Sequence, residues 1–153
     1  MNNLIMQIPL KPLSVNSKFT LHYKSRRIIK SNSANRFEKE VASHLLRYSK
    51  NMAEFRDSFN PKTEALTLEV VLYVPREEFF TKDNRVSSTC IDAGNALKML
   101  EDIIYKALGI NDGLNVKVSS EKRPVARDEW LTLVMITKVE KPRICALDAI
   151  AFT

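Results

Sequence analysis

Apolar side chains recur along the chain with two different periods, and these periods predict its main strands and helices. Over residues 65–75 every second side chain is apolar, which predicts a strand that Pro75 ends. The face of this strand that we expect to be buried consists of Leu66, Leu68, Val70, Leu72 and Val74. Apolar side chains at helical spacing over residues 34–53 predict an amphipathic helix. They are Phe37, Val41, Leu45, Tyr48 and Met52.

The N-terminal segments predict a strand and a hairpin. Residues 4–10 read as a short strand, and a loop follows at 11–16 because Pro12 cannot donate a backbone hydrogen bond to a sheet. Residues 18–30 alternate loosely and carry several basic side chains, which predicts an exposed basic hairpin. A solvated loop is an equally good interpretation of that stretch.

The C-terminal half predicts one more helix and two more strands. Residues 76–90 read as a polar connection, and a helix is expected over 92–108, where Gly109 ends it. The two strands are expected at 114–122 and 129–139, around a turn near Pro124. The order strand, hairpin, helix, strand, helix, strand, strand predicts an α+β fold, with two main helices packed on a small mixed sheet.

Length and composition are those of one globular domain over residues 1–153. We expect the apolar C-terminal extension, at about 141–153, to dock on another surface, for example on a second subunit. Neither cysteine belongs to a metal-binding motif, and no secretory signal or membrane-spanning stretch is visible, so an intracellular location and no membrane partner are expected.

The charge balance favours a polyanionic partner. Lys and Arg number 24 against 18 Asp and Glu, a net charge of +6. Nucleic acid is one such partner, although many soluble proteins are basic without a specific reason. Charge alone leaves both interpretations open.

The segment 92–112 carries the candidate chemistry. On a helical wheel one face gathers Asp92, Asn95, Lys98, Asp102 and Lys106. The neighbouring face is an apolar stripe of Ala96, Leu97, Leu100, Ile103, Ile104, Ala107 and Leu108. A surface helix with opposite charges at i, i+4 would show the same pattern.

A second carboxylate follows the helix at Asp112, in a turn-forming Asn-Asp-Gly stretch. Together with Asp92 it could bind a hard cation such as Mg²⁺, and Lys98 could stabilise charge on a transferring phosphate. The spacing does not prove that these side chains converge.

At this point the sequence resembles the RusA family of phage- and prophage-encoded Holliday junction endonucleases. The family motif Asp-x-Asp-Asn-x-x-Lys-x-x-x-Asp stands here as DAGNALKMLED at residues 92–102, followed by an acidic turn at Asn111 and Asp112. Flanking stretches IPLKPLSVN, FFTKDN and SSEKRP come in the family's order. The resemblance covers most of residues 4–140.

The resemblance implies roles for these residues. Asp92 matches the first catalytic carboxylate and Lys98 the catalytic lysine, while Asp112 matches the acidic residue after the helix. Asp102 matches a further motif aspartate, for which a structural role is also open, and Asn95 an asparagine expected to fix the helix start. Family members are homodimers that use Mg²⁺ or Mn²⁺ and nick four-way junctions symmetrically during DNA recombination and repair.

One departure from the family pattern weakens the catalytic prediction. Gly94 stands where the family has its second carboxylate, and Asn111 leaves Asp112 as the one acid in its turn. Glu101 lies on the wrong side of the wheel to compensate, and Asp83 lies in a loop whose position the sequence does not predict.

Three hypotheses therefore stay open. The first is a metal-dependent junction endonuclease with Asp92 and Asp112 as metal ligands. The second is a catalytically impaired relative that binds branched DNA or a protein, and the third is a basic protein–protein adaptor. The residues expected to contact DNA are Lys24, Arg26, Arg27, Lys30, Lys82 and Arg85.

Overall fold

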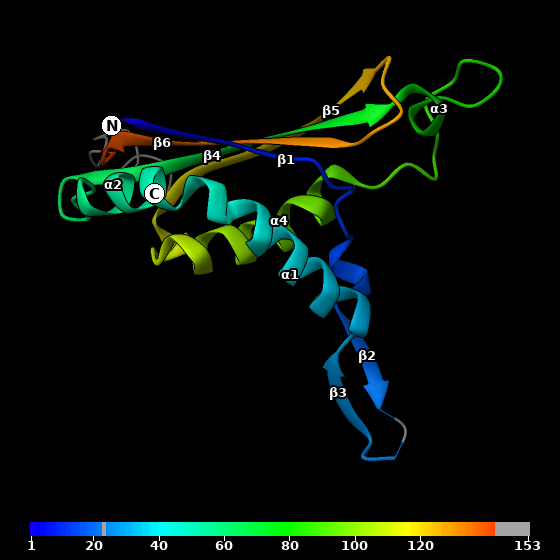
Figure 1. Ribbon diagram of the computed structural model, residues 1–153, viewed down its shortest axis with the longest axis horizontal. Helices are drawn as coiled ribbons and strands as arrows, with labels where there is room; N and C mark the ends of the chain where they lie inside the picture. Colours follow the sequence, from blue (N-terminus) through cyan, green and yellow to red (C-terminus); the bar gives the residue numbers. More distant parts are fainter. Residues whose placement is uncertain (23, 143–153) are drawn as a thin grey trace, which may run out of the picture.

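A mixed four-stranded sheet forms one layer of the molecule, and helices cover one of its faces (Figure 1). The computed structural model describes residues 1–22 and 24–142. The sheet has the order β1-β6-β4-β5, in which β4 pairs antiparallel with β6 and parallel with β5. Its strands are β1 (Asn3–Ile8), β4 (Glu64–Pro75), β5 (Asn115–Val125) and β6 (Leu131–Glu140). The predicted α+β fold is confirmed.

The predicted alternation in β4 is confirmed. Its expected inner face, from Leu66 to Val74, is fully buried under the helices. The two strands predicted around a turn near Pro124 are confirmed as β5 and β6, but β5 continues through Pro124, which pairs with Val74, and the turn follows Val125. β5 is an edge strand, and one side of an edge strand has no neighbouring strand to receive backbone hydrogen bonds, so the sheet tolerates a proline there.

The first helical segment is interrupted, whereas one continuous helix was predicted. It consists of α1 (Asn32–Leu45), the short 3₁₀ helix η2 (Leu46–Tyr48) and α2 (Ser49–Asp57). At the break, Tyr48 leaves the helical region with φ −105° and ψ 7°. Its hydroxyl accepts a hydrogen bond from the Gln7 backbone N–H at 3.0 Å, which ties the break to β1.

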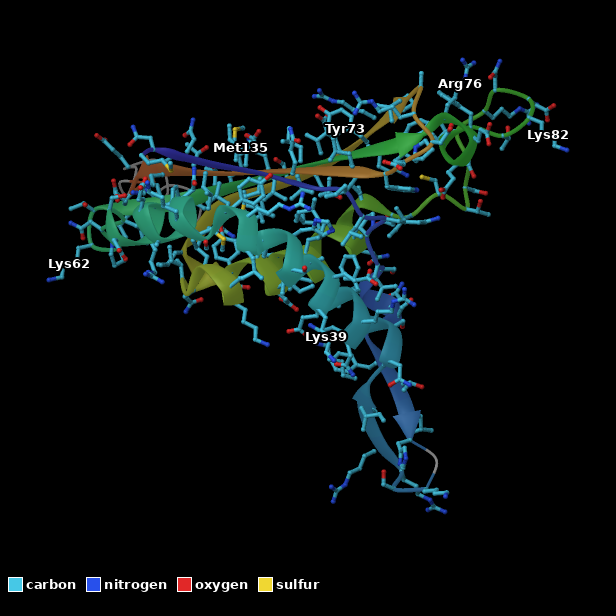
Figure 2. All side chains as sticks on the ribbon, in the orientation of Figure 1. Lys39, Lys62, Tyr73, Arg76, Lys82 and Met135 are labelled. Atoms are coloured by element: carbon cyan, nitrogen blue, oxygen red, sulfur yellow. The ribbon has the colours of Figure 1, made fainter. Side chains whose placement is uncertain are left out.

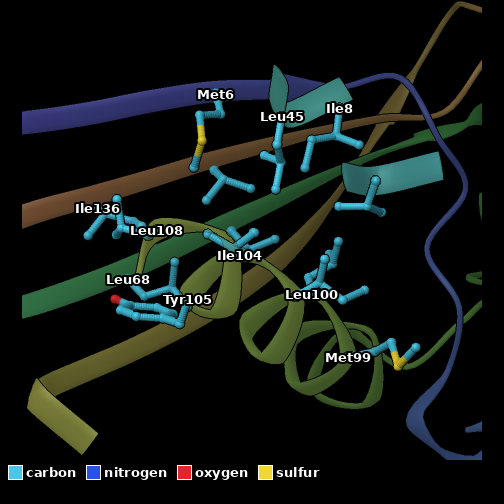
Figure 3. Close-up of a cluster of buried hydrophobic side chains, with 14 of the residues drawn as sticks. Met6, Ile8, Leu45, Leu68, Met99, Leu100, Ile104, Tyr105, Leu108 and Ile136 are labelled. Carbon is cyan, nitrogen blue, oxygen red and sulfur yellow. The ribbon is translucent and has the colours of Figure 1, made fainter. Parts of the chain in front are cut away.

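The helix α4 (Ala93–Leu108) packs under the sheet and ends where predicted. Gly109 takes the left-handed conformation with φ 73°, which glycine adopts without a steric penalty. Figure 3 shows Leu100, Ile104 and Leu108 among side chains of the sheet and α1. The buried set on α4 also includes Met99, Glu101 and Tyr105, which the wheel had placed outside the apolar stripe.

A two-stranded hairpin projects beyond α1, away from the sheet (Figure 1). It consists of β2 (Phe19–His22) and β3 (Arg27–Lys30), and the 3₁₀ helix η1 (Val15–Ser17) precedes it. The predicted exposed basic hairpin is confirmed. A short helix, α3 (Arg76–Phe79), opens the polar connection after β4. Within the described ranges no helix has the length and apolar character needed to cross a membrane.

Candidate active site

The N-terminus of α4 holds the first candidate carboxylate. Asp92 is the N-cap residue, and its Oδ1 accepts a hydrogen bond from the Asn95 backbone N–H at 2.9 Å. The helix start was expected to depend on the Asn95 side chain, but the capping side chain is that of Asp92. The carboxylate is exposed, so it stays accessible to a ligand from solvent.

Lys98 brings the remaining candidate residues together. Its Nζ lies 3.4 Å from Asp112 Oδ2 and 3.4 Å from Asp102 Oδ1. Asp112 begins the 3₁₀ helix η3 (Asp112–Leu114), whose cap Asn111 accepts a hydrogen bond from Gly113 N–H at 2.8 Å. The chain reverses at Gly109, and this reversal returns Asp112 to the polar face of α4.

A third carboxylate contacts Lys98, and the wheel did not predict it. Glu101 Oε2 lies 3.2 Å from Lys98 Nζ, and the residue is only 8% exposed. Its other oxygen, Oε1, accepts a hydrogen bond from Asn115 Nδ2 at 2.9 Å. The prediction that Glu101 points away from the site is therefore wrong. The i, i+3 spacing of Lys98 and Glu101 was the available signal.

These contacts favour the charged forms of Lys98 and Asp102. Burial alone would lower the pKa of Lys98, but the hydrogen bond and charge of Glu101, together with Asp102, raise it above its usual range. Burial alone would likewise raise the pKa of Asp102, but Lys18 and Lys98 hold it below its ordinary value. Near neutral pH the Lys98 ammonium group is therefore paired with the Asp102 carboxylate.

Ion pairs connect this site to the base of the hairpin. The second oxygen of Asp102 pairs with Lys18, the residue before β2. Lys30, at the end of β3, pairs with Glu38 of α1, which also lies 2.8 Å from Lys106 of α4. The sequence did not predict the ion pair between Lys18 and Asp102. Lys30, which was expected to contact DNA, has a carboxylate partner within the chain.

The other expected DNA contacts lie at two separate ends of the molecule. Lys24, Arg26 and Arg27 are exposed at the tip of the hairpin. Lys82 and Arg85 are exposed in the turn that follows α3, beyond the end of β4 and away from the hairpin tip (Figure 2). The same turn contains Asp83, away from Lys98.

A groove of about 370 Å³ runs beside the Lys98 cluster and is lined partly by Asp102, Lys106 and Asp112. Among the described residues, no group of three or more Asp, Glu, His or Cys side chains could hold a metal ion. Mg²⁺ commonly binds through one or two carboxylates plus waters and substrate phosphate. The exposed carboxylate of Asp92 and the half-exposed one of Asp112 are oxygen donors of that kind. Asp92 caps the start of α4, and it is not among the carboxylates that pair with Lys98.

Comparison with known proteins identifies the family. The family model described as Endodeoxyribonuclease RusA matches residues 9–137, and no curated protein matches the chain. The matched range contains the hairpin, all of α4 and the turn with Asp112. It thus covers most of the chain, including every residue of the site. The chain therefore belongs to the RusA endodeoxyribonuclease family.

Proposed function

We propose that this protein binds four-way DNA junctions and nicks them symmetrically by metal-dependent phosphodiester hydrolysis. Membership of the RusA family implies Holliday junction resolvase activity. The observation that carries the finer proposal is the approach of Asp112 to Lys98, 3.4 Å apart, from the two sides of a chain reversal. A lysine and a carboxylate beside an open groove can act together on one phosphate.

Each residue has a separate task in this proposal. Lys98 stays protonated and stabilises the negative charge that develops on the phosphate oxygens. Asp92 and Asp112 would hold Mg²⁺ or Mn²⁺, together with waters and the substrate phosphate. The bound ion would activate the attacking water and offset charge on the phosphate. Asp102 orients Lys98 by pairing with it and with Lys18.

The basic hairpin supplies a surface for the DNA backbone. Its exposed Lys24, Arg26 and Arg27 would contact phosphates, which provides affinity without reading base sequence. Lys82 and Arg85 would contact a second part of the junction from the turn that follows α3. Lys30 has its carboxylate partner Glu38, so we assign it to holding the hairpin in place.

A homodimer fits the two-fold symmetry of a four-way junction. Two copies of the chain would present two copies of the site, one for each of two symmetric nicks. The oligomeric state is measured by light scattering of the purified protein with and without a junction.

The direct test uses a synthetic four-way junction labelled in turn on each strand. With Mg²⁺ or Mn²⁺ we expect paired, symmetric nicks, and with Ca²⁺ or EDTA we expect binding without cutting. A linear duplex of the same sequence is the matched substrate control. Binding of the junction without any nick in Mg²⁺ or Mn²⁺ would contradict the proposal.

The second candidate function is junction binding without cleavage, and Gly94 favours it. A Cβ at Gly94 would lie 3.2 Å from Asp92 Oδ1, so a restored carboxylate would stand beside the first one after a small shift. An acidic side chain in the first helical turn is also favourable to the helix dipole. If the chain binds junctions but does not cut them, Gly94→Asp is expected to produce nicking. Absence of that gain would count against a simple loss of one ligand.

A further inference from the structure

A directional chain of hydrogen bonds runs through the interior side of the site. The Tyr105 hydroxyl donates to Asn115 Oδ1 at 2.5 Å, and Asn115 Nδ2 donates to Glu101 Oε1 at 2.9 Å. Lys98 Nζ approaches the other oxygen, Glu101 Oε2, at 3.2 Å. Burial raises the pKa of Tyr105, so its hydroxyl remains a donor at neutral pH.

This arrangement fixes the orientation of every group in it. Because Tyr105 occupies the Asn115 carbonyl oxygen, the amide nitrogen must face Glu101. A carboxylate that is only 8% exposed is costly unless it is paired, and here each oxygen has a donor. An apolar side chain could fill the space at position 101 without the cost of burying a charge.

The position of Asn115 explains why this matters for the site. Asn115 is the first residue of β5 and directly follows η3, which begins at Asp112. A bond from Glu101 to Asn115 therefore holds the end of the turn that carries Asp112. The same Glu101 side chain holds Lys98, whose ammonium lies 3.4 Å from Asp112.

We propose that Glu101 is a positioning residue that sets the distance between Lys98 and Asp112, with one carboxylate oxygen on Lys98 and the other on Asn115. This inference rests on the proposed function, because it assigns Glu101 a task within the same site. Glu101 does not touch the substrate in this role. It acts through Lys98 and through the Asp112 turn.

The test exchanges the two functional groups of the Glu101–Asn115 pair. Glu101→Gln keeps the size of the side chain but removes its charge and one acceptor. Combining it with Asn115→Asp reverses the bond, since the introduced glutamine can donate to the introduced aspartate and still accept from Lys98. Glu54→Gln, at an exposed position on α2, is the control for loss of one negative charge.

Two readouts separate this inference from the proposed function. The first is the rate constant of junction cleavage beside the junction Kd measured in Ca²⁺. Glu101→Gln is expected to lower the rate constant by roughly tenfold or more with unchanged Kd, as replacement of an outer-shell partner does. The exchanged pair is expected to recover most of the loss, and Glu54→Gln to match the wild type.

The second readout is the ¹⁵N–¹H NMR spectrum of the metal-free protein, which does not depend on activity. The Asp112 and Gly113 amide signals are expected to shift in Glu101→Gln and to return in the exchanged pair. Unmoved signals in Glu101→Gln overturn the proposal, whether or not the wild type cuts DNA. Signals that move in Glu101→Gln but do not return in the exchanged pair also overturn the proposal. A cleavage rate of Glu101→Gln equal to that of the wild type overturns it as well.

If Glu101→Gln does not fold, the double variant with Glu101→Gln and Asn115→Asp is the test of the proposal. Recovery of the fold and of the two amide signals supports the pairing. Failure of the exchanged pair to fold overturns it. If the wild type binds junctions without cutting them, the proposed function fails, while the NMR comparison still tests the position of the Asp112 turn.

Discussion

Lys98 is the residue on which the geometry of the site depends. Its ammonium group lies within 3.4 Å of carboxylate oxygens from Glu101, Asp102 and Asp112, so it neutralises part of a strong local negative charge. Half of its side chain remains exposed, at 52%, so a phosphate can reach it from solvent. The lysine can therefore exchange an internal carboxylate for a substrate phosphate without leaving its place.

Replacing Lys98 is expected to remove cleavage and to leave binding largely intact. Lys98→Ala should lower the cleavage rate constant by roughly 10²–10³, the cost of removing one donor that stabilises transition-state charge. Junction Kd in Ca²⁺ should change little, because the hairpin supplies most of the contacts. Lys62→Ala, at an exposed position between α2 and β4, is the control. An equal loss of affinity and rate would contradict this assignment.

Asp102 makes the stability of the fold depend on acid pH. Its pKa lies below the ordinary value of 3.8, so its ion pairs stabilise the fold fully above that pH. This contribution is lost as the pH falls through the lowered folded-state pKa. Asp102→Asn should therefore unfold more easily than the wild type by roughly 1 kcal/mol at pH 7.

The difference between wild type and Asp102→Asn should shrink toward zero as the pH falls through the lowered folded-state pKa of Asp102, because below it both side chains are uncharged. Urea unfolding at several pH values measures it. Asp57→Asn serves as the control, because Asp57 is exposed on α2 and pairs only with its neighbour Arg56 among the described residues. A difference that persists unchanged in acid would contradict the role of the ion pairs.

Helix α4 combines a structural and a chemical task at its first residues. Asp92 caps the helix through Oδ1, while the carboxylate as a whole is exposed to solvent. The helix dipole favours negative charge at this end of α4, so the acidic cap is well placed for the helix. The cap and the proposed metal ligand are thus one side chain, and substitutions can separate the two tasks.

Two substitutions at Asp92 are expected to differ in stability but not in activity. Asn is as good a cap as Asp, so Asp92→Asn should keep the wild-type stability, whereas Asp92→Ala should lose about 1 kcal/mol. Both should abolish metal-dependent cleavage, since neither supplies a carboxylate. Thermal unfolding and the nicking assay measure the two effects. Cleavage by Asp92→Asn would show that Asp92 caps the helix but is not needed as a metal ligand.

At the scale of the whole molecule, the projecting hairpin is attached through charge. Lys18 and Lys30 stand at the two ends of the hairpin and pair with Asp102 of α4 and Glu38 of α1. The tip residues Lys24, Arg26 and Arg27 are left exposed for a partner. The same element therefore has anchoring cations at its base and free surface cations at its tip.

Removing the tip cations should weaken junction binding in a salt-dependent way. Changing Lys24, Arg26 and Arg27 together to Gln is expected to raise Kd by tenfold or more at moderate salt. The slope of log K against log salt should fall by roughly 0.9 for each phosphate that the variant no longer neutralises. The matched control changes Arg47, Lys50 and Lys62, which are exposed near the opposite end. Equal effects of the two triple variants would mean that only net charge matters.

Much of the fold could be predicted from the sequence, because its signals are local. Alternation in β4 and the glycine that ends α4 depend on neighbouring residues, so both were predicted correctly. The spacing of Lys98 and Asp102 likewise predicted that the two side chains share one face of α4, where they form an ion pair. The C-terminal extension, expected at about 141–153 to dock on another surface, lies almost entirely outside the described residues, which end at 142.

Two of the errors, the break in the helix at Tyr48 and the burial of Glu101, involve contacts between segments distant in sequence. A wheel assumes that one side of a helix is buried, but α4 packs against α1, α2, η1 and the start of β5 as well as lying under the sheet. This wider burial encloses Glu101 and Tyr105 and pairs Glu101 with Asn115.

The sequence determines which residues can do chemistry and on which elements they stand, because side-chain type and periodicity are properties of the chain itself. Which of them meet is decided by tertiary packing. The reversal at Gly109 brings Asp112 to Lys98, and the docking of the hairpin brings Lys18 to Asp102. No local pattern encodes these distances, since each depends on how two separate elements pack on the same core.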